Sequence, residues 1–239
     1  MGKQKTLMDT INSFPDTKKP YQIFLGGPQN TRMNIHDSEL VATRKLIQEK
    51  NLRVYVHSQY IINLCHTPSN DDWNTKLLIK NLEYANAIGC KGVVVHVGKS
   101  TNQELSVAME SMRKNVESVI QHATIECPLL LETPAGQGTE TLCDIKQFID
   151  FVVSFDNPRL RICVDTCHVF ACGYNPQTYV EEVCNRGDLL RLIHYNDSST
   201  PCGSRVDRHA FMGSGHIGID KMASIAKCCG DKKLSMVIE

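Results

Sequence analysis

Seven short apolar runs recur along the chain, and most of them are separated by stretches long enough for a helix. The runs predict strands at 21–26, 53–58, 92–97, 128–133, 160–166, 189–195 and 235–239. The apolar spacing between them predicts helices at about 3–13, 37–50, 71–88, 103–123, 140–154, 176–186 and 220–229, with a long loop at 196–219. Asp37 or Ser38 is expected to cap the helix at 37–50. Strands that alternate with helices predict a parallel sheet with right-handed crossovers.

The length of 239 residues fits one α/β barrel better than two domains. No repeat, low-complexity tract or linker divides the chain, so residues 1–239 are expected to form a single domain. A closed (β/α)₈ TIM barrel needs eight strands. The chain begins in the first expected helix and stops on the last residue of a strand. We therefore expect an α/β TIM barrel that lacks the first strand and the last helix; either the barrel is incomplete or the chain is a truncated product.

Six of the seven runs end in, or lead into, a residue that can bind a metal ion, and only the run at 21–26 carries none. These residues are His57, His96, Glu132, Asp165 with His168, His194 and Glu239. In a (β/α)₈ barrel the carboxyl ends of the strands meet at one mouth, where the active site lies. A single histidine at a strand end is more often a hydrogen-bonded structural residue than a ligand. Its recurrence on six strands predicts one polynuclear metal centre.

The loop at 196–219 adds the pair Asp207 and His209, which gives nine candidate ligands. Zinc binds about four imidazole or carboxylate ligands per ion. Nine ligands are too many for one zinc and suit about three, with one carboxylate shared between two of them. Three divalent ions outweigh the negative charge of the carboxylates, so the centre is expected to favour an anion such as a phosphodiester. Paired metals can activate water and stabilise both oxygens of an in-line displacement.

The composition limits which partners, membrane segments and compartments can be expected for this protein. The chain has 26 basic and 26 acidic side chains, so any binding to nucleic acid must come from a local patch. No apolar stretch approaches the length of a membrane span, and the N-terminal residues lack the apolar core of a signal peptide. Eleven cysteines without an export signal favour a reducing intracellular compartment, cytoplasm or nucleus. Cys163, deeper in its strand than Asp165, is expected to be a small buried residue and not a zinc ligand.

Six motifs resemble the endonuclease IV family of apurinic/apyrimidinic (AP) endonucleases, which are zinc-dependent DNA-repair enzymes on a (β/α)₈ barrel. The resemblance covers nearly the whole chain, and LETPAGQG together with GSRVDRH is its most specific part. The motifs are GGPQNTR (26–32), VHSQYIINL (56–64), VVHVGKS (94–100), LLETPAGQGTE (130–140), ICVDTCHVFACGY (162–174) and HYNDSSTPCGSRVDRHAFMGSGHIG (194–218).

The resemblance implies a role for each candidate ligand. It implies that one zinc is bound by His57 and His96, and that Glu132 is the bridging, catalytic carboxylate. A second zinc would be bound by Asp165, His194 and Glu239. A third would be bound by His168, Asp207 and His209. The implied reaction is hydrolysis of the phosphodiester 5′ to an abasic site by a monomer, which leaves a 3′-hydroxyl and a 5′-deoxyribose phosphate.

The resemblance also implies contacts with double-stranded DNA that carries an abasic site. The family's DNA-penetrating residues match Tyr60 and Ile61, and a second probing loop matches Gln29, Asn30 and Arg32. An abasic site has lost its base and its stacking, so kinking the duplex there costs less than elsewhere. An apolar wedge can fill the gap. The alternative for Tyr60 and Ile61 is ordinary core packing, since the apolar run continues beyond them.

Two other interpretations stay open. The first is a sugar isomerase or epimerase of the xylose-isomerase-like group, which shares the barrel and a one- or two-metal site but has no use for the probing loops. The second is a zinc-stabilised DNA-binding scaffold without catalysis. Structural zinc sites are closed, often rich in cysteine and local in sequence, unlike a histidine and carboxylate set that is spread over six strands. Metal content per chain separates the three.

Overall fold

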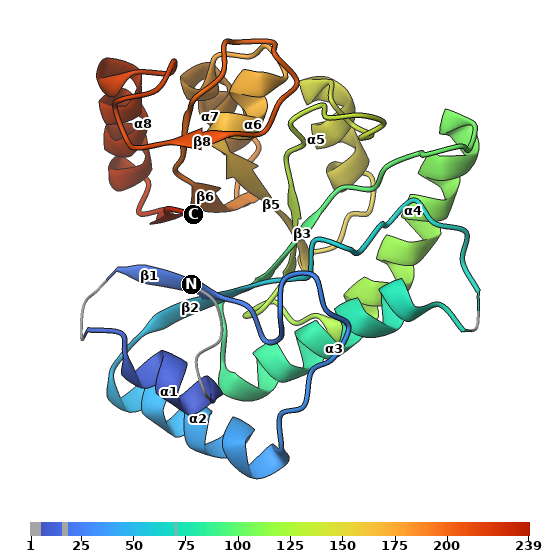
Figure 1. The fold of residues 1–239 in the computed structure, drawn as a ribbon, viewed down its shortest axis with the longest axis vertical. Coiled ribbons are helices and arrows are strands. Elements are labelled where there is room, and N and C mark those ends of the chain that lie inside the picture. Colours follow the sequence, from blue (N-terminus) through green and yellow to red (C-terminus); the bar gives the residue numbers. More distant parts are fainter. Residues whose placement is uncertain (1–5, 16–18, 70) are drawn as a thin grey trace.

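The computed structural model describes residues 6–15, 19–69 and 71–239. Its main feature is a nearly closed barrel of parallel strands in the order β1-β2-β3-β4-β5-β6-β9, with helices on the outer face (Figure 1). The strands are β1 (Pro20–Ile23), β2 (Arg53–His57), β3 (Val93–His96), β4 (Leu129–Glu132), β5 (Leu160–Asp165), β6 (Leu190–His194) and β9 (Ser235–Val237). The expected seven-stranded TIM barrel is thus confirmed.

Helices connect the barrel strands. They are α1 (Leu7–Asn12), α2 (Asp37–Glu49), α3 (Trp73–Ile88), α4 (Leu105–Val119), α5 (Ile145–Val153), α6 (Thr166–Ala171), α7 (Pro176–Cys184) and α8 (Ile219–Asp231). A 3-10 turn at Ile120–His122 extends α4, and a small hairpin of β7 (Asp197–Ser198) and β8 (His209–Ala210) lies in the long loop. Within the described residues, no helix has the length and apolar character that crossing a bilayer requires.

Three local expectations were wrong, and part of another lies outside the described residues. The start of the helix expected at 3–13 is not described. His36, not Asp37 or Ser38, is the N-cap of α2, and no side chain caps it there. Helix α5 begins at Ile145, later than expected, because residues 133–144 form a loop in which Glu140 forms a bridge with Lys99, three residues after β3. Helix α6 and the β7–β8 hairpin were not expected, since both are too short to show a period.

A packed layer fills the barrel below its mouth. It consists of Tyr55, Val94, Leu130, Cys163, Leu192 and Val237. Each of these residues lies two positions before a candidate ligand, and side chains two apart on a strand point to the same face. Cys163 is completely buried in this layer, as expected. The candidate ligands therefore lie directly above this buried layer, and their side chains point into the barrel mouth.

The strand register sets neighbouring candidate ligands level with each other at two strand pairs. His96 pairs with Glu132 between β3 and β4, and Asp165 pairs with His194 between β5 and β6. The residues of the opposite strand face, such as Val54 and Val95, are buried under the helices. Burial of both faces explains why these strands appear as continuous apolar runs in the sequence.

The barrel is open on one side, between β1 and β9 (Figure 1). Each of these strands has one hydrogen-bonded strand neighbour among the described residues. A cavity of about 700 Å³ lies between them, with Phe14, Tyr21 and Met236 in its wall. At the mouth, the Gln22 side-chain amide donates to Glu239 Oε1 at 2.7 Å and spans the gap. The two open edges agree with a barrel that has seven strands.

Candidate metal centre

Glu132 is the centre of the site. It ends β4 and is completely buried. Its Oε2 lies 3.2 Å from His57 Nε2 and 3.1 Å from His96 Nε2. Its Oε1 lies 2.8 Å from His194 Nδ1 and 3.5 Å from His168 Nδ1. One carboxylate thus faces imidazoles from both sides with both oxygens, which is the arrangement that a carboxylate shared by two metal ions requires.

A second group of donors lies beside Glu132 at the ends of β5, β6 and β9. His194 Nδ1 lies 3.1 Å from Glu239 Oε2 and 3.8 Å from Asp165 Oδ2. The donor atoms of these three residues and Glu132 all lie within 4.8 Å of one another. Their side chains are buried, except that Glu239 is 18% exposed. Four donors at this spacing can surround one ion.

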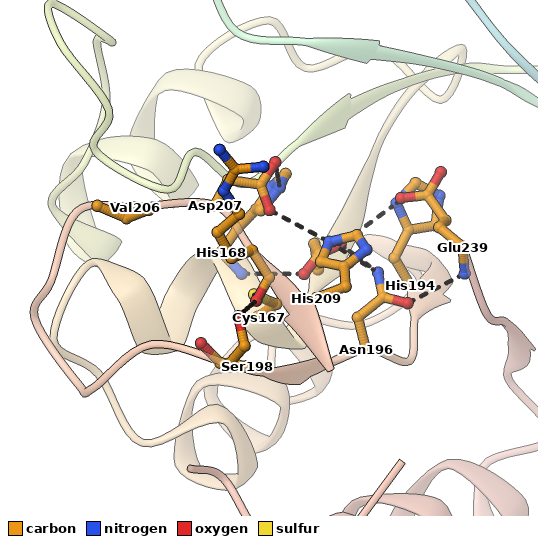
Figure 2. A network of polar contacts seen from close by, with 12 residues as sticks. Cys167, His168, His194, Asn196, Ser198, Val206, Asp207, His209 and Glu239 are labelled. Atoms are coloured by element: carbon orange, nitrogen blue, oxygen red, sulfur yellow. Dashed lines mark hydrogen bonds and ion pairs between the residues drawn. The ribbon is translucent and has the colours of Figure 1, made fainter. Parts of the chain in front are cut away.

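A third group forms where α6 meets the long loop. His168 Nε2 lies 3.2 Å from Asp207 Oδ2, and His209 Nε2 lies 3.2 Å from Asp207 Oδ1 (Figure 2). His209 Nε2 also lies 3.7 Å from Asp165 Oδ2, so this group adjoins the second one. The β7–β8 hairpin brings His209 here, and α6 brings His168. Residues far apart in the sequence thereby become neighbours.

The thiol of Cys167 also lies near Asp207 and His209. Its Sγ lies 3.6 Å from the carbonyl oxygen of Arg208, to which it donates. Burial raises the pKa of this thiol to about 11. In this structure the Cys167 thiol is therefore hydrogen-bonded to the backbone of the segment that carries Asp207 and His209.

Electrostatic coupling is strong in this cluster. Burial alone would raise the pKa of Glu132, but His194 and His96 outweigh burial and hold it well below its usual value. Burial also opposes ionisation of Glu239, yet His194 lowers its pKa to about 2. Conversely, Asp165 and Asp207 raise the pKa of His168 well above its usual value against the effect of burial. Glu132 and Glu239 are therefore held in their charged form.

The donor set fits zinc. Imidazole nitrogens and carboxylate oxygens are ligands that zinc prefers, and all nine candidates converge at one mouth. Glu132, Asp165 and Glu239 place three carboxylates close together in a largely buried space. Buried like charges are costly unless cations neutralise them, and burial already raises the pKa of Asp165. Bound divalent ions would remove this cost.

Sequence reasoning missed two residues that hydrogen-bond to the candidate ligands. Gln22 lies on β1, the strand expected to carry no ligand, and its Oε1 lies 2.9 Å from His194 Nε2. Asn196 donates from Nδ2 to Asp165 Oδ2 at 2.7 Å and accepts from the Glu239 backbone N–H at 3.0 Å. A polar side chain at an inward position of an apolar run was the one available signal for Gln22. No local signal marks Asn196.

Asp197 fixes the loop that follows β7. Its buried carboxylate accepts backbone N–H bonds from Ser198 at 2.8 Å and from Gly213, Gly215 and Ile217 at 3.0 Å each. A Cβ on Gly215 would lie 2.3 Å from the Ser198 carbonyl oxygen, so only glycine fits there. The GSGHIG segment is thus held by one carboxylate next to the hairpin that carries His209.

The two expected DNA-probing loops lie beside each other at the mouth. The backbone N–H of Tyr60 donates to the Pro28 carbonyl oxygen at 2.9 Å and joins them. The Tyr60 side chain is 47% exposed, and its ring centroid lies 5.1 Å from that of His57. Gln29, Asn30 and Arg32 are exposed, and Ile61 is half-buried. Tyr60 is therefore not a core residue.

The chain matches a family model described as xylose isomerase-like TIM barrel over residues 21–231. A Mesomycoplasma hyopneumoniae protein named "Probable endonuclease 4" is 35% identical over 211 residues, which cover 85% of this chain and 76% of that protein. A Staphylococcus epidermidis protein of the same name is 31% identical over 232 residues, with 92% and 77% covered.

Solved structures with a similar fold include an endonuclease IV and an epimerase-like protein. Endonuclease IV from Thermus thermophilus superposes with a TM-score of 0.82 at 25% identity, covering 100% of this chain and 90% of that one. A D-tagatose 3-epimerase-like protein superposes with a TM-score of 0.76 at 17% identity, covering 99% and 85%. The second likeness shows the barrel fold alone.

Proposed function

Because this chain belongs to the endonuclease IV family of xylose isomerase-like TIM barrels, we propose that it is a zinc-dependent endonuclease that cleaves duplex DNA 5′ to abasic sites. Its products would carry a 3′-hydroxyl and a 5′-deoxyribose phosphate. The observation that supports this best is the position of Glu132, whose two oxygens face His57 and His96 on one side and His194 on the other. About three zinc ions would share the nine candidate ligands.

Bound zinc would supply an activated water and would stabilise the departing 3′-oxygen, so no side-chain nucleophile is needed. Glu132 would hold two ions at a fixed separation. Asp165, His194 and Glu239 would complete the second ion's ligands, and Gln22 would orient His194. His168, Asp207 and His209 would hold the third ion.

The exposed loops would recognise the lesion. Tyr60 stands over the imidazoles of His57 and His96, with its ring centroid 5.4 Å from that of His96. We propose that Tyr60 and Ile61 enter the space left by the missing base and that Gln29, Asn30 and Arg32 probe the adjoining backbone. An abasic duplex kinks more readily than an intact one, so the wedge would favour damaged DNA.

The test uses purified protein and a duplex with a single tetrahydrofuran abasic analogue. This analogue cannot undergo β-elimination, so a lyase leaves it intact and a hydrolase cuts it. We expect one cut 5′ to the analogue, a 3′ end that a DNA polymerase extends, and loss of cutting after chelation. Elemental analysis should give about three zinc ions per chain.

Cutting of a natural abasic site to a 3′-unsaturated aldehyde, with the analogue left intact, would show a lyase and refute the proposal. A protein that binds at most two metals and interconverts sugars would be an isomerase. A protein that binds zinc and abasic DNA without cutting it would be a scaffold.

A further inference from the structure

Gln22 lies on the open side of the barrel and contacts two candidate ligands at once. It is a half-buried residue of β1, whose edge faces β9 across the opening. Its Oε1 lies 2.9 Å from His194 Nε2, and its Nε2 donates to Glu239 Oε1 at 2.7 Å. One side-chain amide therefore joins the ends of three strands, β1, β6 and β9.

The two contacts use the atoms that His194 and Glu239 turn away from the other donors of the centre. His194 Nδ1 lies 2.8 Å from Glu132 Oε1 and 3.1 Å from Glu239 Oε2. The Nε2 of the imidazole and the Oε1 of the Glu239 carboxylate face Gln22 instead. Gln22 can therefore fix both side chains without contacting the atoms that face the centre.

The chemistry of the amide decides which nitrogen of His194 carries a proton. Glu239 is a carboxylate and only accepts, so the NH₂ end of the Gln22 amide must face it and the carbonyl end must face His194. A histidine that binds a metal ion is neutral and carries one proton. Because the Gln22 carbonyl oxygen accepts from His194, that proton lies on Nε2, and the lone pair of Nδ1 is directed toward the centre.

Two other imidazoles of the centre are oriented by the backbone instead. His57 Nδ1 lies 2.7 Å from the Ser58 carbonyl oxygen, and His168 Nδ1 lies 2.9 Å from the Thr133 carbonyl oxygen. The Nε2 atoms of both face carboxylates of the centre. Every residue supplies a backbone carbonyl, whereas one substitution removes a side-chain amide. Of these three imidazoles, His194 is the one whose second nitrogen contacts a side chain.

We propose that Gln22 is a positioning residue that selects the Nε2-protonated form of His194, holds Glu239 beside it and so sets the affinity of the second metal site. This inference rests on the proposed zinc centre, in which both residues bind the second ion. Groups that hydrogen-bond to metal ligands from behind contribute about 10- to 100-fold to metal affinity. Loss of the Gln22 amide should weaken one site by this factor and leave the others unchanged.

The variant Gln22→Met keeps the length of the side chain and removes both hydrogen bonds. The cavity of about 700 Å³ adjoins this residue, so the thioether has room and the strands should not shift. In a chelator titration of the zinc-loaded protein, we expect one ion per chain to leave at a roughly 10- to 100-fold lower chelator concentration than in the wild type. In zinc-buffered solutions, cutting of the abasic-analogue duplex should recover as free zinc rises, with KM unchanged. A variant that was merely misfolded would not recover.

The proton on His194 is measured directly in the zinc-loaded wild type. In protein labelled with ¹⁵N at histidine, two-bond couplings between ring nitrogens and ring protons distinguish the Nδ1–H from the Nε2–H form. We expect the Nε2–H form at His194, with slow exchange of this proton with water. Exchange should be faster in Gln22→Met. The wild-type spectrum tests the proposal even where the variant fails to fold.

Gln177→Met is the matched control, because Gln177 in α7 also donates from its amide to a carboxylate, that of Glu181 at 3.0 Å, outside the barrel. It should release zinc as the wild type does. A wild type that holds no zinc would refute the proposed function itself. A zinc-loaded wild type with the His194 proton on Nδ1 would overturn only the role of Gln22. Identical zinc release from Gln22→Met and the wild type would overturn it as well.

Discussion

Replacing Glu132 with glutamine keeps the size of the side chain and removes one negative charge. The carboxylate is completely buried, and its oxygens lie 2.8 Å from His194 Nδ1 and 3.1 Å from His96 Nε2. The backbone bonds of β4 do not depend on the side chain, so the barrel should persist. The substitution therefore tests the charge of the proposed bridging ligand and little else.

The magnitude follows from the loss of a buried charge that is shared by several partners. Loss of one preorganised group that stabilises charge in a transition state lowers turnover by about 10²- to 10³-fold, and we expect a fall of this size here. Affinity for one of the metal ions should fall as well, because the amide is neutral.

Cleavage is measured on the abasic-analogue duplex under single-turnover conditions, beside metal content per chain and the circular dichroism spectrum. The matched control is Glu110→Gln, because Glu110 is an exposed residue of α4 that pairs with Lys114 at 3.1 Å, away from the mouth. The control should cut at the wild-type rate. Near-normal turnover of Glu132→Gln with full zinc content would refute the bridging role.

The remaining predictions concern recognition and stability. Replacing Tyr60 and Ile61 with alanine should weaken binding to abasic duplex more than to intact duplex, because only the kinked lesion takes a wedge; equal losses in an anisotropy titration would count against this. Asp197→Asn should lower stability by about 1–3 kcal/mol, because each carboxylate oxygen accepts two backbone N–H bonds and the amide nitrogen that replaces one oxygen can accept neither; unchanged urea unfolding would contradict it. Chelation should lower the melting temperature by roughly 5–10 °C, since a ligand at a hundredfold of its Kd adds about 2.7 kcal/mol and each kcal/mol shifts Tm by about 2–4 °C; indifference to chelator in calorimetry would rule this out. Asp72→Ala, at the N-cap of α3, should cost about 1 kcal/mol. Although burial opposes it, the Thr75 hydroxyl lowers the pKa of Asp72, so this contribution should be full above about pH 4 and decline as pH falls further; equal acid unfolding of wild type and variant would contradict it.

Local pattern determined the barrel and most of its candidate centre. Strands buried on both faces appear as continuous apolar runs, and their period of two fixes which side chains share a face. The residue two positions after a member of the buried barrel layer therefore points into the mouth. His57 does so after Tyr55, and Glu132 does so after Leu130. Parallel strands bring their carboxyl ends together, so strand ends in the sequence were sufficient to predict a cluster.

Local pattern did not determine where segments end when distant contacts compete with it. The stretch at 140–144 has a helical spacing, yet Glu140 forms an isolated bridge with Lys99, and the Thr141 hydroxyl donates to the Gly98 carbonyl oxygen at 3.0 Å. These bonds keep the segment in a loop, so α5 begins only at Ile145, with Asp144 as its N-cap. Contacts of the same kind determine where the short helix α6 begins. Its N-cap is Asp165, which is also a candidate ligand.

Only the tertiary structure identified the residues that act on the ligands from a distance in sequence. Gln22 meets His194 across the opening between β1 and β9, and a single glutamine in an apolar run carries no sign of that partner. Side chains on one strand follow a period of two, whereas contacts between segments depend on packing. The clustering of the candidate ligands could therefore be predicted from the sequence, and the residues that contact them from other segments could not.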